Sequence, residues 1–256
     1  PSDWENNWDK DKNKVADFLE NWNDLYAYSK YLRDTDKSPN KNSQFGFMSS
    51  LNNLYLNGQF LFSYGAYIFG ENSDGTLNSA DIGFSNGNSA KGLMAMRQMA
   101  SLMDEGCIDD TVIMTRYEKI ANGEYFCTVS TPDTYSLFIE KLVLAYEKEG
   151  LSYEEASKKA AENLMMVELP GKMPADGDLS KDSATMSDSD WVDTLVMGGV
   201  NGYGISSYTK YKDACFEFVN FATSYEMIAK RMEILGIAPT RSDVAEISGG
   251  VTDTIF

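Results

Sequence analysis

Apolar residues recur along this chain at spacings that predict short helices alternating with shorter strands. Spacings of three and four residues, typical of one helix face, mark the segments 22–32, 89–104, 137–149, 153–164, 214–222 and 224–235. Compact apolar runs typical of buried strands occupy 45–50, 125–129 and 164–170. Because strands alternate with helices, the pattern predicts an α/β fold.

Signals at the ends of these segments sharpen their boundaries. Ser152 and Glu155 form a capping-box pattern for the helix 153–164, and Ser224 is expected to cap the helix that follows it. Gly106 is a suitable residue just past the helix 89–104. Between such segments, residues 72–86 are predicted to form a hairpin-like turn, and residues 171–190 a long, mobile acidic loop.

A glycine-rich stretch opens the last part of the chain. Gly198, Gly199, Gly202 and Gly204 fall within seven residues, before the two predicted helices 214–222 and 224–235. A phosphate-binding loop would carry Lys-Ser/Thr after its glycines, and none follows here. We therefore interpret 195–200 and 204–205 as main chain that crosses a sheet.

Composition restricts the function more than it defines it. The net charge is −17, with 39 acidic and 22 basic residues, which argues against binding to nucleic acid or anionic lipid. Histidine is absent, which excludes Ser-His and Cys-His nucleophile systems and His-ligated zinc. Three widely spaced cysteines are expected to be small buried apolar residues. Together with the lack of nucleotide-binding and nucleophile motifs, this predicts a protein without a cofactor.

Two acidic segments carry side chains of the kind that bind metal ions. Asp34, Asp36, Ser38 and Asn40 alternate as calcium-loop ligands do, but Pro39 stands where glycine is needed, and a closing glutamate is absent. The loop 171–190 contains five aspartates that could hold a cation, although a solvated loop is the simpler explanation and the one we expect; they are Asp176, Asp178, Asp182, Asp188 and Asp190. We predict no metal site in either segment.

Candidate ligand-binding chemistry lies in the first half of the chain. Residues 51–72 are rich in Tyr, Phe and Asn, including Asn53, Tyr55 and Tyr64. Aromatic rings stack on the apolar faces of sugars, and amides bond to sugar hydroxyls. The strand 125–129 leads into a proline turn at 130–135, the position where α/β proteins place ligand contacts.

Five stretches, taken in order, resemble extracellular solute-binding proteins of carbohydrate ABC transporters, in the branch of maltose-binding proteins. They are "NWNDLYAYSKYLRDTD", "FLFSYGAYIFGEN", "NSAKGLMAMRQMASLMDEGCI", "YEKIANGEYFCTVSTPDTYS" and the segment 198–244, which begins "GGVNGYGISS". Each stretch is short, and their order and spacing carry the resemblance.

The resemblance implies a periplasmic-binding-protein fold, with two α/β lobes around a ligand cleft. Residues 1–197 would form most of the second lobe, and residues 198–256 a hinge crossing and a returning segment of the first lobe. The chain begins at Pro1 without a signal peptide, so we expect it to be part of a longer protein that is extracellular and lipid-anchored, or periplasmic. The implied partners are a carbohydrate ligand and a membrane permease, and the implied state is a monomer.

The resemblance also places the substrate contacts. Asn53 and Tyr55 match a polar–aromatic pair that contacts sugar in the family. Asp133 stands where the family often has a stacking aromatic, with Tyr135 as the nearest ring, and Val200 stands where an aromatic follows the two glycines. The predicted substrate-binding set is Asn53, Tyr55, Tyr64, Asp133, Tyr135, Gly199, Val200, Asn201 and Tyr203.

The leading hypothesis is a non-enzymatic sugar receptor that closes its lobes around a carbohydrate and delivers it to a permease. Two alternatives from other classes remain open at this point. A carbohydrate-active hydrolase would use two converging carboxylates, for which 39 acidic residues offer many pairs. A surface interaction module would retain the fold without a functional cleft.

Overall fold

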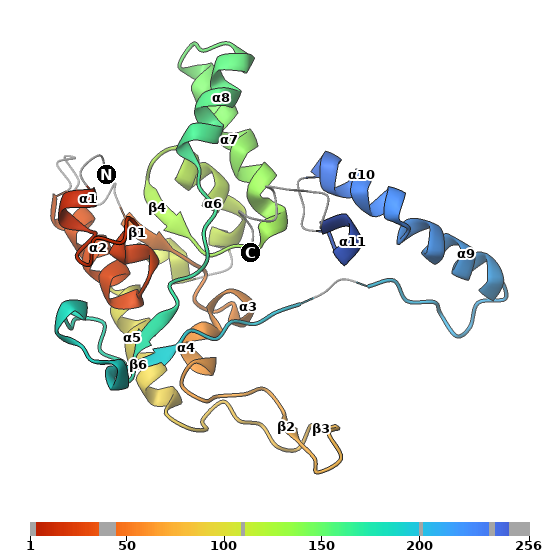
Figure 1. The fold of residues 1–256 in the computed structure, drawn as a ribbon, viewed down its shortest axis with the longest axis horizontal. Helices are drawn as coiled ribbons and strands as arrows, with labels where there is room; N and C mark the ends of the chain where they lie inside the picture. Colours follow the sequence, from red (N-terminus) through yellow and green to blue (C-terminus); the bar gives the residue numbers. More distant parts are fainter. Residues whose placement is uncertain (1–3, 36–44, 109–110, 200–201, 236–238, 246–256) are drawn as a thin grey trace. The chain divides into compact units, whose positions relative to one another are not determined.

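The computed structural model describes residues 4–35, 45–108, 111–199, 202–235 and 239–245 (Figure 1). Its helices are α1 (Trp4–Asn7), α2 (Trp22–Thr35), α3 (Leu54–Asn57), α4 (Gln59–Phe62), α5 (Ser89–Ala100), α6 (Thr111–Ala121), α7 (Tyr135–Lys148), α8 (Tyr153–Asn163), α9 (Lys212–Ala222), α10 (Tyr225–Leu235) and α11 (Ser242–Ala245). Its strands are β1 (Phe45–Met48), β2 (Gly70–Glu71), β3 (Leu77–Asn78), β4 (Tyr125–Thr128), β5 (Lys172–Pro174) and β6 (Trp191–Asp193). Short 3₁₀ turns are η1 (Asp17–Leu19), η2 (Glu105–Ile108), η3 (Pro132–Thr134), η4 (Ser183–Thr185) and η5 (Asp188–Asp190).

The chain forms two compact units, and each contains two separate segments. Unit 1 comprises residues 1–129 and 168–197, and unit 2 comprises residues 130–167 and 198–256. One border of the units falls between residues 197 and 198, and residues 130–167 cluster with the C-terminal segment. The assignment of residues 1–197 and 198–256 to two lobes stays a prediction.

Unit 1 is built around the parallel pair of β1 and β4. Phe45 lies opposite Tyr125 and Met48 opposite Thr128 in the register of the pair. Helix α2 packs directly on β1, and Gly46 allows the close approach, because a Cβ at this position would lie 2.4 Å from the main chain of Ser29. All four residues of β1 are buried, as expected for a strand covered on both faces.

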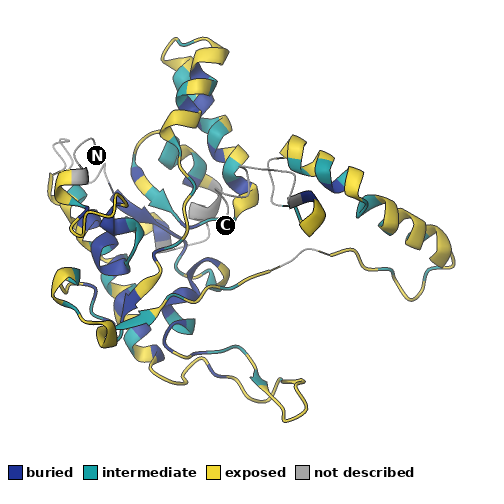
Figure 2. Ribbon diagram, in the orientation of Figure 1, coloured by how far each residue is buried: buried dark blue, intermediate teal, exposed yellow. Residues whose placement is uncertain are grey.

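Aromatic side chains fill the core of unit 1. Trp22 is fully buried, and its ring contacts Phe47 at 5.6 Å and Phe60 at 5.1 Å between centroids in edge-on geometry. Phe18 stacks on Tyr28 at 4.3 Å. Figure 2 shows the buried residues of this unit concentrated in α2 and β1. Such edge-on and stacked pairs add to the free energy gained from burial of the rings.

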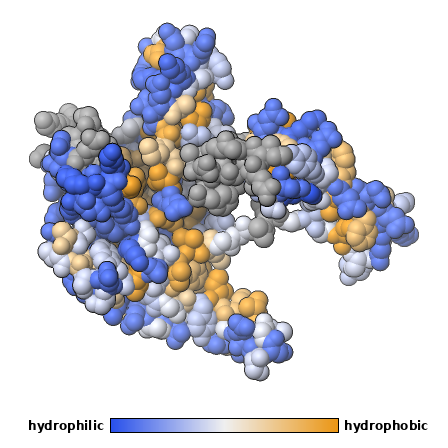
Figure 3. All heavy atoms as spheres, viewed as in Figure 1, coloured by the Kyte–Doolittle hydropathy of each residue, from blue (hydrophilic) through white to orange (hydrophobic). Residues whose placement is uncertain are grey.

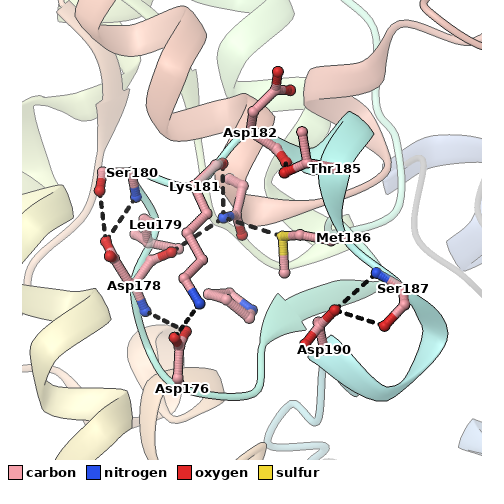
Figure 4. Close-up of polar contacts among 12 residues, drawn as sticks. Asp176, Asp178, Leu179, Ser180, Lys181, Asp182, Thr185, Met186, Ser187 and Asp190 are labelled. Atoms are coloured by element: carbon pink, nitrogen blue, oxygen red, sulfur yellow. Dashed lines mark hydrogen bonds and ion pairs between the residues drawn. The ribbon is translucent and has the colours of Figure 1, made fainter.

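The segment 171–190, predicted as a mobile loop, is instead folded against the core of unit 1. Its strand β5 pairs antiparallel with β6, and Leu179 is almost fully buried. The Asn23 amide of α2 donates to the main-chain oxygens of Asp178 and Lys181. Several of its aspartates accept bonds from within the loop: Asp178 from Ser180, Asp190 from Ser187, and Asp176 from Lys181 (Figure 4).

Unit 2 contains an antiparallel pair of helices, α7 and α8. Phe138 and Leu142 of α7 and Ala156 of α8 are buried along the pair. Gly150 lies between the two helices with φ of +99°, a left-handed conformation that ends α7 and favours glycine. The predicted capping box of α8 is confirmed, with the Ser152 N–H donating to Glu155 Oε2 at 3.0 Å.

Helices α9 and α10 follow in the C-terminal part of unit 2. The predicted cap at Ser224 is confirmed, because its Oγ accepts the N–H of Met227. Phe216, Phe218 and Phe221 of α9 are each almost three-fifths exposed, and no residue of this helix is buried. Figure 3 accordingly shows apolar surface over this helix.

Most predicted elements are confirmed, and three are wrong. The strand predicted at 164–170 is an extended connection without a paired strand, and Met165 is 76% exposed. The described parts of 195–205 also contain no strand. The helix predicted to reach Asp104 ends at Ala100, where the chain turns and the Ser101 hydroxyl bonds to the Gln98 carbonyl.

No described helix combines the length and the apolar character that a membrane crossing requires.

Candidate ligand site at the carboxyl ends of β1 and β4

A small hollow opens in unit 1 where β1 and β4 end. Because the two strands are parallel, their carboxyl ends meet at one edge, which is the usual position of ligands in α/β folds. The residues that line the hollow are Met48, Ser49, Ser50, Leu56, Arg116, Thr128 and Val129. They come from the two strand ends, from α3 and from α6.

A network of hydrogen bonds holds the chain that leaves β1. Ser49 Oγ donates to Asn57 Oδ1 at 2.8 Å, and Asn57 Nδ2 donates to the main-chain oxygens of Ser50 and Asn53. Ser49, Ser50 and Asn57 are all buried. The loop from β1 to α3 is therefore fixed by its own side chains, which makes it a rigid support for neighbouring groups.

Asn53 begins helix α3 at the edge of this network. Its Oδ1 accepts the main-chain N–H groups of Tyr55 at 3.0 Å and Leu56 at 3.4 Å, which is the arrangement of an N-cap. The amide oxygen is therefore used within the protein, and the NH₂ group is the part of the side chain that can bond to a ligand.

Tyr55 lies on α3 and is 43% exposed. Its main-chain N–H is bonded to Asn53, so the cap fixes the position of the residue at the start of the helix. A partly exposed tyrosine on a rigid turn can stack on an apolar face of a ligand and bond through its hydroxyl. The structure thus brings Asn53 and Tyr55 together, as two of the predicted site residues.

Arg116 on α6 is the residue of this hollow that sequence reasoning missed. Its side chain is buried, with the guanidinium 4.8 Å from the ring centroid of Tyr117 and Nη2 bonded to the Tyr117 hydroxyl at 2.9 Å. Its Nε and Nη1 are buried without a hydrogen-bond partner among the described residues. Because an unpaired buried donor is costly, these two nitrogens are suited to bind an oxygen of a ligand. Nothing in the local sequence distinguishes Arg116 from a surface arginine.

Tyr64, another predicted contact, lies in the core of unit 1. It is 4% exposed, and its hydroxyl donates to the carbonyl of Pro174 at 2.7 Å. Burial, with a smaller contribution from Asp176, raises the pKa of this hydroxyl. The core surrounds the Tyr64 ring, which joins α4 to β5.

The remaining described residues of the predicted set belong to unit 2. Asp133 is exposed in η3, and Gly199 is exposed in an extended segment. Tyr135 begins α7 with its hydroxyl 3.5 Å from the carbonyl of Leu164. The Tyr203 ring packs edge-on against Phe218, and its hydroxyl accepts a bond from Arg231 at 3.4 Å.

Two predicted residues, Val200 and Asn201, lie outside the described part of the chain, as does most of the loop tested for calcium at 34–45. The participation of the unit 2 residues in one site with Tyr55 stays a prediction.

The architecture resembles that of solved maltodextrin-binding proteins. The structure of MalX from Streptococcus pneumoniae in complex with maltopentaose superposes with a TM-score of 0.59 at 18% identity, covering 96% of this chain and 55% of that one. The maltose-binding protein MalE from Listeria monocytogenes, in complex with maltose, gives 0.54 at 17% identity, with 96% and 54% covered. These similarities establish a periplasmic-binding-protein fold of the α/β class, of which the chain spans about half.

Sequence comparison then defines the family. A family model described as bacterial extracellular solute-binding protein matches residues 6–255. The chain belongs to this family of bacterial extracellular solute-binding proteins. Its members are binding proteins rather than enzymes, which removes the hydrolase alternative. The galactooligosaccharide-binding protein of Bacillus subtilis (strain 168) is 30% identical over 116 residues, which cover 44% of this chain and 25% of that protein.

Proposed function

We propose that this chain is the part of an ABC importer's solute-binding component that contacts an oligosaccharide at the carboxyl ends of β1 and β4. The main support for the proposal is that an aromatic ring and a guanidinium group lie at this edge of the strand pair. A half-exposed Tyr55 ring stands on a rigid turn, and Arg116, whose Nε and Nη1 are buried without a partner among the described residues, lines the hollow beside α3. Sugars offer both an apolar ring face and hydroxyl oxygens, so they match the two groups together.

The ligand class is supported by proteins of similar sequence or fold. One is named for galactooligosaccharides, and others were solved with maltose, maltotetraose or maltopentaose bound. All of these ligands are short chains of neutral hexoses. We infer the same class for this protein, because a guanidinium and hydroxyls line the hollow and the Tyr55 ring lies on α3, which also lines it.

The mechanism follows from the two-lobe fold of the family. In the proposal, residues 1–197 form most of the second lobe, and residues 198–256 form the hinge crossing and the returning part of the first lobe. In the proposal, closure about the hinge completes the contacts to a sugar that is held by Asn53 and Tyr55. The closed monomer would then deliver the sugar to its permease, outside the cytoplasmic membrane and either lipid-anchored or periplasmic.

Saturation-transfer NMR of the chain with maltose, maltotriose, maltopentaose and a galacto-oligosaccharide tests the proposal, because the method detects weak binding. We expect transfer of saturation from the protein to the sugar ring protons. The strongest signal should come either from the maltose series or from the galacto-oligosaccharide.

Two variants locate the binding. Tyr55→Ala should lose the transfer, whereas Tyr153→Ala, which removes a 70% exposed ring on α8, should keep it. An absence of transfer to every sugar from the folded chain would overturn the proposal. Equal transfer in both variants would place the sugar elsewhere and overturn the assigned site.

A further inference from the structure

Residues 9–20 of unit 1, which lead from α1 into α2, carry oxygen-bearing side chains in a distinctive spacing. Counted from Asp9, such side chains stand at positions 1, 3, 5, 9 and 12; they are Asp9, Asp11, Asn13, Asp17 and Glu20. Calcium loops of the helix–loop–helix type take their ligands from positions 1, 3, 5, 7, 9 and 12, with position 7 supplying a main-chain carbonyl. Position 7 is Val15 in this loop.

The fold brings the separated carboxylates together. Asp11, Asp17 and Glu20 each offer one oxygen, and these three oxygens lie within 4.8 Å of one another. The Lys10 N–H donates to both carboxylate oxygens of Asp17, at 3.1 and 3.3 Å, which closes the end of the loop onto its beginning. Oxygens at such separations can contact a common ion, since calcium–oxygen distances are about 2.3–2.6 Å.

Asp9 gives an independent indication of a ligand. The residue is 4% exposed, and its Oδ2 accepts the N–H of Lys14 at 3.3 Å across the loop. Its Oδ1 is buried and has no hydrogen-bond partner among the described residues. The bond to Lys14 restrains the carboxylate of Asp9 at the beginning of the loop. A buried carboxylate oxygen without a partner is costly, and a bound cation removes that cost.

The main chain of the loop adopts the shape that such a site needs. Lys14 stands at position 6, where calcium loops use glycine for a sharp turn, and its φ is +70°. A lysine in this left-handed region is uncommon. The bond from its N–H to Asp9 is also the one that closes the turn, so the glycine-like conformation is present without the glycine.

The charges around the loop favour a cation as well. One carboxylate oxygen each from Asp11, Asp17 and Glu20 lies within 4.8 Å of the other two, so their like charges repel one another. The Lys10 ammonium is already paired with Asp24 at 2.8 Å and Asp182 at 3.3 Å.

Asn13 occupies the space between two of the carboxylates. Its Nδ2 donates to Asp11 and Glu20, and its Oδ1 accepts the N–H of Val15. Half a turn about the Cβ–Cγ bond would present Oδ1 to an ion in the same place.

We propose that residues 9–20 bind a calcium ion through Asp9, Asp11, Asn13, Asp17, Glu20 and the main-chain carbonyl of Val15. An all-oxygen set of this size suits calcium, which accepts six to eight oxygens in flexible geometry. Magnesium requires a tighter octahedron and keeps several waters, so a loop that offers this many protein oxygens favours calcium.

The site is coupled to the core of unit 1. Phe18 lies between two of the ligands in sequence, is buried, and stacks on Tyr28 of α2. Asn21, directly after Glu20, accepts the N–H of Asp24 through its side chain and so caps α2. Calcium binding therefore fixes the entry to α2, and it stabilises the fold whether or not the chain binds a sugar.

Terbium luminescence and calcium titration test the site on the chain after treatment with a chelator. Trp8 directly precedes the first ligand, so excitation of tryptophan should sensitise terbium bound in the loop. We expect saturable emission that calcium displaces. Calorimetric titration with calcium should give a dissociation constant in the range of extracellular modules, about 10⁻⁴–10⁻³ M. Thermal unfolding should shift upward in calcium.

Two variants and one control assign the ion to the loop. Glu20→Gln and Asp11→Asn should each weaken calcium binding at least about tenfold, because each removes a charged ligand. Asp188→Asn, at an exposed aspartate outside the loop, should leave calcium binding unchanged. Asp11 is exposed, so Asp11→Asn tests the site even if Glu20→Gln fails to fold. Absence of calcium binding to the original chain, or unchanged binding in both variants, would overturn the proposal.

Discussion

The sulfur of Cys107 lies 3.0 Å from the hydroxyl oxygen of Tyr125 in the interior of unit 1. The same oxygen accepts the N–H of Asp104 at 3.3 Å, so one hydroxyl connects β4 with the turn at η2. Cys107 is fully buried, and burial raises the pKa of its thiol. Tyr125 also stacks on Phe45 of the neighbouring strand. The pair therefore joins the central strands to the segment that follows α5.

Replacement of Tyr125 by phenylalanine should destabilise the protein by about 1–3 kcal/mol, because the partners of the hydroxyl become unsatisfied while the ring stays in place. Urea unfolding measures the effect, and Tyr153→Phe, at an exposed tyrosine, is the matched control. An equal free energy of unfolding in both variants would show that the hydroxyl contributes nothing. The variant should also leave sugar and calcium binding unchanged.

Stability should fall in acid through Asp104. Burial raises the pKa of its carboxyl, but the bond from Lys119 at 2.8 Å and the contact with Tyr125 outweigh burial, so the pKa is lowered overall. A lowered pKa contributes stability above the unfolded value of about 3.9, and this stability is lost as the pH falls through the folded value. Asp104→Asn should therefore flatten the decline of the free energy of unfolding below about pH 4. A decline as steep as in the original chain would contradict this.

The capping box of α8 should contribute measurably to the stability of unit 2. Ser152→Ala removes the acceptor of the Glu155 N–H, and we expect a loss of about 1 kcal/mol, as for other serine caps. Ser136→Ala, on the exposed side of α7, removes a hydroxyl outside any cap and serves as the control. Amide exchange at the first turn of α8 should accelerate in the first variant only.

Local patterns were sufficient to predict much of the fold. The apolar runs that became β1 and β4 are short and buried, and the Ser152–Glu155 pair determines a helix start by itself. The strand predicted at 164–170 failed because an apolar run forms a strand only where a partner strand is available. Met165 is exposed in that segment, and the paired strand β5 begins only at Lys172.

The candidate sites were harder to predict, because they depend on which side chains the fold brings together. Arg116 became a candidate only when α6 placed its guanidinium in the hollow without partners for two nitrogens. The loop 9–20 has a spacing visible in the sequence, but Lys14 occupies the position of the expected glycine, and its left-handed φ becomes known only from the fold. Asn53 and Tyr55, in contrast, are only two positions apart in the sequence, so they must lie close together in the fold.

Arg116→Met separates a binding role from a structural one. If Arg116 donates to the sugar, the loss of two bonds from a charged group should weaken sugar binding by about 1.5–3 kcal/mol or more. The free energy of unfolding should stay constant or rise, because methionine fills similar space without the two buried donors that lack partners. If Arg116 has only a structural role, the substitution should instead lower the free energy of unfolding. It should then leave the sugar affinity of the remaining folded protein unchanged. Calorimetry and urea unfolding of the same samples distinguish the two outcomes.

Tyr55→Ala tests the stacking role directly. The ring is 43% exposed, so its removal creates little cavity, and the Asn53 cap on α3 keeps its bonds to main-chain N–H groups. We expect sugar binding to weaken by roughly 1–3 kcal/mol, as for an aromatic anchor that is desolvated on binding, with little change in the unfolding midpoint. Tyr55→Phe should retain most of the affinity, because a phenylalanine ring offers the same apolar face. If the phenylalanine variant binds as weakly as the alanine variant, the hydroxyl is the contact and the stacking role is wrong.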